Sequence, residues 1–245
     1  MSPTGPTGYE RPTSVGDRLP MRLLLAALAL VLLGAIAVSL LSPQRSAPTG
    51  RGTPEALPSP QLVGALSLEE ALQARRSIRS FSTQMLTRAE IGQLLWAAQG
   101  VTDAAGHRTA PSAGALYPLE LDVVTQDGVA RYTPAEHRLT WRTTTDIRPA
   151  LRAAALDQSV VGEAPLIIIV SGVVERTATR YGTERARRYV ALEAGHAAQN
   201  ILLQAVSLGL GAVPVGAFDD AAVRRILLLA DEEAPLYLIP VGRPR

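Results

Sequence analysis

The run Pro165-Leu166-Ile167-Ile168-Ile169-Val170 is the feature that most restricts how this chain can fold. It has no polar side chain, so polar and apolar residues do not alternate as they do in a strand with one face in water. A continuous apolar run of this length is typical of a strand that is covered on both faces. We therefore expect it to lie centrally in a sheet.

Further strands are predicted on either side of this run. Residues 119–125 and 129–133 flank the turn Asp127-Gly128 and form a hairpin, to which residues 137–142 can add a third strand. A last strand is expected at 236–241. The hairpin supplies an antiparallel element within the predicted sheet.

Helix starts are marked by two capping boxes, Ser67-Leu68-Glu69-Glu70 and Thr87-Arg88-Ala89-Glu90. The first predicts a short helix that runs into Arg75, and the second a helix that ends at Gly100. A longer helix is expected from about 183 to 208, with Gly209 as its stop, and a final one after Asp219. Together these elements predict an α+β fold in which helices pack around a mixed sheet.

Composition excludes several functions. The chain has 245 residues, no lysine and no cysteine. It therefore has no Schiff-base lysine, Walker-type phosphate-loop lysine, disulfide, thiolate nucleophile or cysteine-ligated metal. A net charge of +2 with scattered arginines argues against nucleic acid as a partner. We also expect no metal site.

The first sixty residues differ in composition from the rest. Residues 1–20 and 43–60 are rich in Pro, Gly, Ser and Thr and are expected to be disordered, the second as a linker. Residues 21–42 are apolar, without a charge between Leu23 and Leu41, and predict one transmembrane helix. A cleavable signal peptide is the alternative, although this run is longer than the usual apolar core. A single-pass membrane protein is expected, with the side of its globular domain, residues 61–245, left open.

Two segments suit an anionic, planar ligand. Arg75-Arg76-Ser77-Ile78-Arg79-Ser80-Phe81 gathers three guanidinium groups and two hydroxyls, which matches the donors that a phosphate requires. The segment from Arg108 to Pro118 places small residues between two prolines, so its backbone can approach a flat molecule closely. A planar phosphorylated cofactor would use both segments.

Two later runs complete a set of four, in this order along the chain: Gly209-Leu210-Gly211-Ala212-Val213-Pro214-Val215-Gly216-Ala217-Phe218-Asp219 and Ile239-Pro240-Val241-Gly242-Arg243-Pro244. With these four segments the chain resembles the nitroreductase family of FMN-dependent oxidoreductases, and within it the SagB-type dehydrogenase branch. The resemblance covers roughly residues 66–245. It implies the nitroreductase fold and a homodimer with two flavin sites at the interface.

The resemblance also implies roles for individual residues. The FMN phosphate, ribityl chain and pyrimidine edge would contact Arg75, Arg76, Ser77 and Arg79. Pro111, Ser112, Ala113 and Gly114 would reach the flavin bound mainly by the other subunit, with Tyr117 near the substrate. Pro214, Val215 and Gly216 would lie beside the ring, with a backbone amide near Gly216 donating to flavin N5. Arg243 would close over the phosphate. An acidic residue is commoner in the family where Gly216 stands.

Alternatives remain at the level of chemistry. Glu193 and His196 have the spacing of half a di-iron site, but a buried polar stripe with Asn200 and Gln204 at the dimer interface is the preferred interpretation. The activity expected is hydride transfer through flavin N5 by a ping-pong mechanism, with NAD(P)H as one donor. Whether a peptide or small molecule is oxidised, or a nitroaromatic or quinone reduced, stays open. A flavin-binding storage or redox-sensing protein without turnover is the rival.

Overall fold

The computed structural model describes residues 52–245. The predicted disordered segment 1–20, the predicted membrane-spanning segment 21–42 and the first part of the predicted linker lie outside these residues. Among residues 52–245, no helix combines the length and the apolar character needed to cross a membrane.

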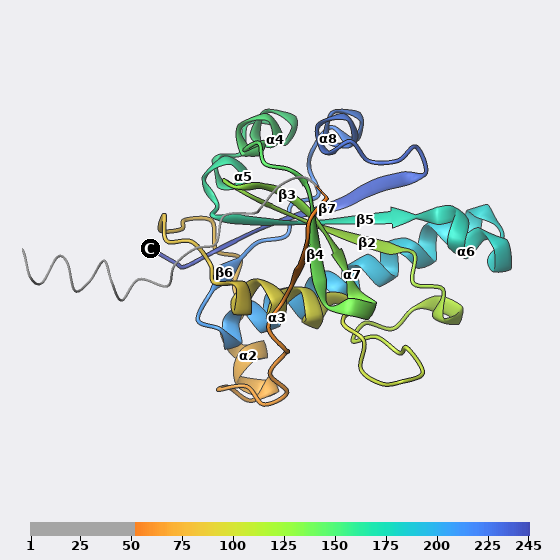
Figure 1. Cartoon of the computed structure of the whole chain (residues 1–245), viewed down its shortest axis with the longest axis horizontal. Helices are drawn as coiled ribbons and strands as arrows, with labels where there is room; N and C mark the ends of the chain where they lie inside the picture. The colour runs from red at the N-terminus through yellow and green to blue at the C-terminus, as the bar shows by residue number, and fades with distance from the viewer. Residues whose placement is uncertain (1–51) are drawn as a thin grey trace, which may run out of the picture. The chain divides into compact units, whose positions relative to one another are not determined.

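A seven-stranded sheet forms the centre of the domain (Figure 1). Its order is β1-β4-β3-β2-β5-β7-β6. The bounds are β1 (Pro54–Ala56), β2 (Leu119–Thr125), β3 (Gly128–Thr133), β4 (Arg138–Thr143), β5 (Leu166–Val173), β6 (Gly211–Ala212) and β7 (Glu233–Gly242). Every residue of β5 is buried, as its uninterrupted apolar run predicted.

The strand directions correct one expectation. All six pairings between these strands are antiparallel, so the sheet is not mixed as predicted. The one parallel contact among residues 52–245 is an isolated bridge between Ser77 and Ala212. Apolar patterning reports how deeply a strand is buried but not the direction of its neighbours, which depends on distant connections.

Helices cover both faces of the sheet, with α2, α3 and α7 on one face and α4, α5 and α8 on the other (Figure 1). Their bounds are α2 (Leu68–Ala74), α3 (Arg88–Gln99), α4 (Arg148–Ala154), α5 (Ser159–Glu163), α6 (Val174–Tyr181), α7 (Thr183–Ser207) and α8 (Asp220–Leu227). Two apolar cores result: one contains buried residues of α3 and α7, the other those of α4, α5 and α8.

The predicted helix ends are confirmed. Ser67 and Thr87 each accept a hydrogen bond at 3.2 Å from the backbone amide three residues on, and the carboxylates of Glu70 and Glu90 accept from the amides of these two cap residues. α3 ends before Gly100, and the 25-residue α7 ends two residues before Gly209, whose φ of 67° is left-handed.

The sequence analysis did not predict several short strands and helices. The strand β1 pairs with β4, so the folded domain begins before residue 61 and the predicted linker is wrong over Pro54–Ala56. The helix α6 follows β5 without an intervening break, and α4 and α5 have seven and five residues. The hairpin turn lies one residue earlier than predicted, because Gly128 already pairs with Thr125. A Cβ on Gly128 would lie 2.0 Å from the Thr143 carbonyl oxygen, so this position requires glycine.

Candidate functional site

The arginine segment that follows α2 is attached to the end of the sheet. Ser77 bridges to Ala212, and the Ile78 amide donates to the Ala212 carbonyl at 3.1 Å. Phe81 bridges to Pro244, and the amide of the next residue, Ser82, donates to the carbonyl of Arg243 at 2.9 Å. The segment therefore lies between β6 and the residues that follow β7, although it is more than 130 positions away in sequence.

The apolar side chains of the arginine segment determine which way the segment faces. Ile78 packs against Gly211, where a Cβ would lie 2.7 Å from the Cβ of Ile78, and Phe81 packs against Gly242 in the same manner at 2.8 Å. With these two side chains turned inward, Arg76, Ser77 and Arg79 are exposed and Arg75 is half-buried. No side chain of residues 52–245 pairs with the guanidinium groups of Arg75 or Arg79, whereas Arg76 donates to the carbonyls of Gln73 and Arg75.

The segment Pro214–Gly216 runs beside β7 at the same part of the sheet. Val215 and Leu238 exchange two backbone hydrogen bonds, at 2.8 and 3.0 Å. Gly216 is exposed, its amide has no partner among residues 52–245, and the nearest atom to a Cβ built there is 4.0 Å away, on the Tyr237 ring. A free amide in open space can donate to a ligand.

Arg243 already has a partner. One of its terminal nitrogens donates to Glu90 Oε1 at 2.7 Å, and its Nε is buried without a hydrogen-bond partner in the described part of the chain. The same carboxylate caps α3 through its second oxygen. The ion pair thus joins the end of β7 to the start of α3, a structural link that the sequence analysis did not predict.

The segment Pro111–Gly114 lies at the opposite end of the sheet. It precedes β2, whose first residue Leu119 pairs with Gly172, whereas β6 pairs with Val241, the partner of Leu166. The six residue steps of β5 from Leu166 to Gly172 span about 20 Å. The predicted site residues therefore form two groups in this chain, one at each end.

The loop that holds this second group has an unusual backbone. Ser112 Oγ accepts from the amide of Tyr117 at 2.9 Å, and Gly114, Ala115 and Tyr117 all have positive φ values of 64°, 53° and 46°. A Cβ on Gly114 would approach Arg180 and Tyr181 to 3.0 Å. A non-glycine residue with a positive φ is strained, and such backbone strain is common in loops that carry function.

The sequence analysis did not predict the contacts beside this loop. The guanidinium of Arg108 stacks on the ring of Tyr117 at 4.4 Å and donates to Gln99 at 2.8 Å. Burial lowers the pKa of Arg108, an effect that the charge of Glu193 opposes. Of the predicted polar stripe, Glu193 is buried within the chain, His196 is exposed, and Asn200 and Gln204 are half-buried.

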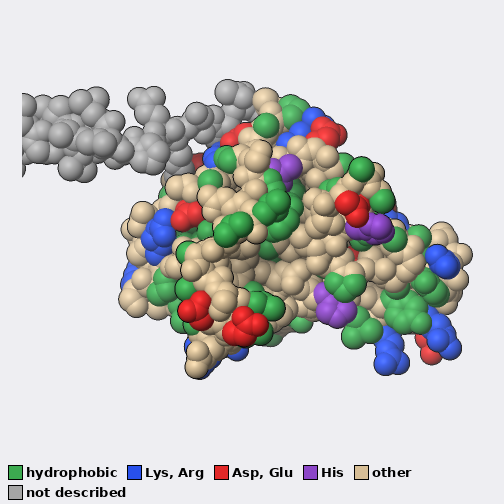
Figure 2. Space-filling model, turned by 90° about the horizontal axis from the view of Figure 1, so that it is seen from below, with side chains coloured by type: hydrophobic (Ala, Val, Ile, Leu, Met, Phe, Trp, Pro, Cys, Tyr) green, Lys and Arg blue, Asp and Glu red, His purple; other side chains and the backbone are tan. Residues whose placement is uncertain are grey.

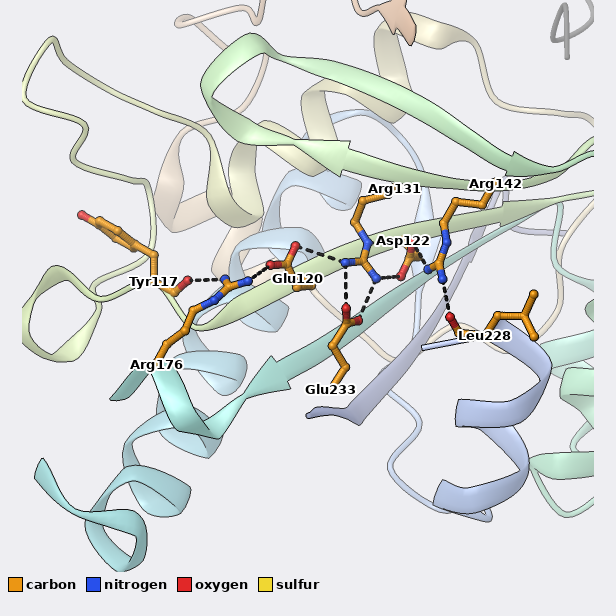
Figure 3. Close-up of polar contacts among 8 residues, drawn as sticks. All are labelled: Tyr117, Glu120, Asp122, Arg131, Arg142, Arg176, Leu228 and Glu233. Carbon is orange, nitrogen blue, oxygen red and sulfur yellow. Dashed lines mark hydrogen bonds and ion pairs between the residues drawn. The ribbon is translucent and has the colours of Figure 1, made fainter. Parts of the chain in front are cut away.

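An ion network connects the loop to the rest of the sheet (Figure 3). Arg131 binds Asp122 at 2.7 Å, Glu233 at 2.8 Å and Glu120 at 3.3 Å. Arg142 joins Asp122 to the Leu228 carbonyl, and Arg176 joins Glu120 to the Tyr117 carbonyl at 3.3 Å. Burial acts to lower the pKa of Arg131, but Asp122 and Glu233 outweigh it and the pKa is raised.

The face formed by α2, α3 and α7 is hollowed and partly apolar (Figure 2). A cavity of about 560 Å³ lies between the segment 61–68, α3 and the second half of α7. Large apolar side chains are exposed in this part of the domain: Leu62, Val63, Leu66, Leu68, Leu72 and Leu192. Exposed apolar area of this kind often marks an interaction surface.

Comparison with models of protein families shows which family the chain belongs to. The model described as "Nitroreductase family" matches residues 72–243, which include both groups of predicted site residues. The chain belongs to the nitroreductase family. The family prediction is confirmed by this match, and the α+β fold with helices flanking a sheet agrees with it.

Relatives agree with the nitroreductase assignment. A candidate nitroreductase of Methanocaldococcus jannaschii is 45% identical over 187 residues, which are 74% of this chain and 93% of the relative. The crystal structure of a candidate nitroreductase from Ralstonia eutropha has a TM-score of 0.72 at 30% identity and covers 84% of this chain and 95% of its own. An NADPH:FMN oxidoreductase of Vibrio harveyi, solved with NAD⁺, has a TM-score of 0.55 at 25% identity, covering 72% of this chain and 68% of its own.

The residues of this nitroreductase suit FMN at the β6 end of the sheet. Unpaired guanidinium groups match a phosphate, which accepts several charge-assisted hydrogen bonds. The free amide of Gly216 and the open space beside it suit a flat ring that needs a donor. Within residues 52–245, no three His, Asp or Glu side chains are grouped so as to hold a metal ion.

Proposed function

We propose that this nitroreductase is a homodimeric FMN-dependent oxidoreductase. The observation that carries the proposal is the meeting of three distant segments at one end of the sheet: the arginine segment, Pro214–Gly216 and the residues that follow β7. When bound there, FMN would supply hydride transfer at N5 in alternate half-reactions, so that kinetics are ping-pong.

In this proposal the chain binds and orients the cofactor. Arg75, Arg76 and Arg79 hold the phosphate, Ser77 binds the polar chain that follows it, and the amide of Gly216 donates to N5. Arg243 is a further cation at this end, with one terminal nitrogen held by Glu90. The segment Pro111–Gly114 is about 20 Å away along the sheet, so it would serve the flavin of a second copy.

The finer proposal is a SagB-type dehydrogenase, which oxidises its substrate, in place of a nitroreductase that draws electrons from NAD(P)H. The four segments in family order support this branch. Tyr117 would lie near the substrate, where Arg108 and Ser112 fix its ring and its amide. Stopped-flow mixing with NADH or NADPH tests the direction: rapid bleaching of the flavin supports reduction by a nicotinamide, whereas inertness toward both supports another donor.

The cofactor is tested on the full-length protein, purified without added flavin. We expect a flavin absorption spectrum and release of about one FMN per subunit on heating. The double variant R75A/R79A should lose at least about a hundredfold in FMN affinity, because each charge-assisted hydrogen bond contributes about 1.5–3 kcal/mol. R225A on α8, which removes an exposed arginine outside these three segments, is the matched control. A colourless protein that takes up no added FMN contradicts the proposal.

A further inference from the structure

A helical projection at one end of the sheet is rich in arginine. It consists of α6 and the first turns of α7, residues 174–189, which we call the arginine tip (Figure 1). The tip holds five arginines against two glutamates, so it alone carries more net positive charge than the whole chain, whose net charge is +2. All five arginine side chains are exposed: Arg176, Arg180, Arg185, Arg187 and Arg188.

Most of these charges lack a partner. Of the five arginines, Arg176 alone forms an ion pair among residues 52–245, and its partner is Glu120 (Figure 3). The other four have no carboxylate within ion-pair distance in the described part of the chain. Arginines elsewhere in the sheet, such as Arg131 and Arg142, are held by carboxylates. The tip is thus a place where cationic charge is left unmatched.

The stability of α7 does not explain this placement. The helix begins at Thr183, so Arg185, Arg187 and Arg188 lie in its first two turns. The amino-terminal end of a helix carries a partial positive charge that disfavours cations. Arg185 and Arg188 are also one turn apart, so like charges face each other along the helix. A bound anionic partner would remove both costs.

The backbone beneath the arginines is well fixed. Gly182, with a φ of 74°, joins the two helices without a longer loop. The rings of Tyr181 and Tyr189 contact each other edge to face, with their centres 5.1 Å apart. Ala186 has no exposed area, so the first turn of α7 is anchored from below. The guanidinium groups are therefore presented from a rigid support, which lowers the entropy lost when a partner binds.

The pattern of charge on the tip favours a polypeptide over other anions. Two exposed glutamates, Glu175 and Glu184, lie among the arginines, whereas the dense phosphates of a nucleic acid favour a uniformly basic patch. No large apolar side chain of residues 174–189 is exposed, whereas a helix that lies in a membrane surface needs an apolar face. Carboxylates bind guanidinium groups in a paired geometry, and a polypeptide can also bring basic side chains to the two glutamates.

We propose that the arginine tip is a docking surface for an acidic polypeptide. The surface adjoins the loop before β2: Arg176 donates to the Tyr117 carbonyl at 3.3 Å, and a Cβ on Gly114 would lie 3.0 Å from a terminal nitrogen of Arg180. A polypeptide held at the tip therefore lies next to this loop. The interaction goes beyond the proposed function, because it requires neither flavin nor turnover.

Fluorescence anisotropy of a dye-labelled peptide of alternating glycine and glutamate, titrated with the full-length protein, tests this inference. The comparison peptide has glutamine in place of every glutamate, so it has the same length without the charge. We expect the glutamate peptide to bind at least about tenfold more tightly at low salt, and added salt to reduce the difference because it screens exposed charges. Equal binding of the two peptides overturns the inference.

Variants assign the binding to the tip. R185Q/R188Q should weaken binding of the glutamate peptide by about fivefold, because two exposed ion pairs are lost. Its Tm should not fall, since removing cations from the first turns of a helix is favourable. R152Q/R225Q makes the same change at exposed positions of α4 and α8 and is the matched control, with binding as in wild type. An equal loss in both variants means that net charge alone drives binding, and it overturns the inference.

Other polyanions test the class of partner. Oligothymidylate and vesicles that contain phosphatidylserine should bind more weakly than the glutamate peptide. Tighter binding of either one, lost in R185Q/R188Q, assigns the tip to a different partner and overturns the inference.

The flavin site is tested on the same samples. R75A/R79A should bind the glutamate peptide as wild type does, and loss of binding there would place the peptide at the proposed phosphate site and overturn the inference. Protein that lacks FMN yet binds the peptide through the tip keeps the docking surface and loses the proposed function. Protein that holds FMN without preferring the glutamate peptide does the reverse.

Discussion

At the scale of single residues, two glycines determine where the cationic side chains point. Gly211 and Gly242 allow Ile78 and Phe81 to pack directly on the backbone, which leaves Arg79 between them and Arg76 before them facing outward. The charged residues themselves carry no information about this orientation. It follows from the absence of two side chains that lie more than 130 positions further along the chain.

Substitution of Gly211 by alanine should therefore move the arginine segment. The added Cβ would lie 2.7 Å from that of Ile78, and overpacking of this kind costs about 1–3 kcal/mol. Urea unfolding measures the loss, and FMN affinity should fall in parallel. G195A on α7 is the control, since no atom lies within 4 Å and alanine in a helix is favoured by about 0.5–1 kcal/mol. Equal stability of G211A and wild type would contradict this packing.

The ionisation of Glu193 should appear in the stability of the protein. Burial raises its pKa to about 7 in the folded state, above its ordinary value of 4.5, so between these values the folded chain holds a proton that the unfolded chain has released. The free energy of unfolding should thus fall as pH rises from 4.5 to 7, by up to about 3 kcal/mol. Chemical unfolding across this range should show a shallower decline for E193Q. Parallel curves would show that Glu193 ionises normally.

At the scale of elements, ion pairs connect strands and loops in addition to the two apolar cores. Arg131 on β3 binds carboxylates of β2 and β7, and Arg142 on β4 ties β2 to the residue after α8 (Figure 3). Arg176 on α6 extends the same network to the carbonyl of Tyr117. The loop beside the proposed substrate is thereby connected to four strands.

Two substitutions separate the centre of this network from its edge. Asp122 has no exposed side-chain area and two arginine partners, so D122N should cost about 3 kcal/mol because it removes the buried charge that pairs with both Arg131 and Arg142. The Arg176 side chain is 44% exposed, and R176A should cost less than about 1 kcal/mol. R176A should nevertheless raise KM, while Tm stays close to that of the wild type. Thermal unfolding with steady-state kinetics measures both, and a large loss of Tm in R176A would contradict this ranking.

At the scale of the whole molecule, the two groups of site residues must meet between copies if they contact one flavin. Mixing R75A/R79A with A113W, each defective in one group, tests this arrangement. Random exchange of subunits gives half heterodimers, in which one of two sites is intact, so about a quarter of the sites should recover FMN binding. Flavin fluorescence after unfolding and refolding of the mixture measures the recovery. No recovery would show that one chain supplies both groups.

The sequence predicts the elements with local signals and misses those without them. Capping boxes predicted the starts of α2 and α3, and an uninterrupted apolar run predicted β5. The strand β1 has three residues, one of them proline, and only its pairing with β4 makes it a strand. Likewise, the pair of Arg243 with Glu90 joins residues 153 positions apart, so no local pattern could reveal it. The roles of the predicted flavin contacts stay predictions.

The attachment of the arginine segment has a consequence for biosynthesis. Phe81 and Ser82 are held by Pro244 and Arg243, and the amide of Arg245 donates to the Ser80 carbonyl at 3.3 Å. While the chain is still being made, residues 75–82 have left the ribosome long before the strand neighbours that hold them have been translated. The nascent chain accordingly cannot form the proposed phosphate site, and cofactor loading would begin only after residue 245 has been added.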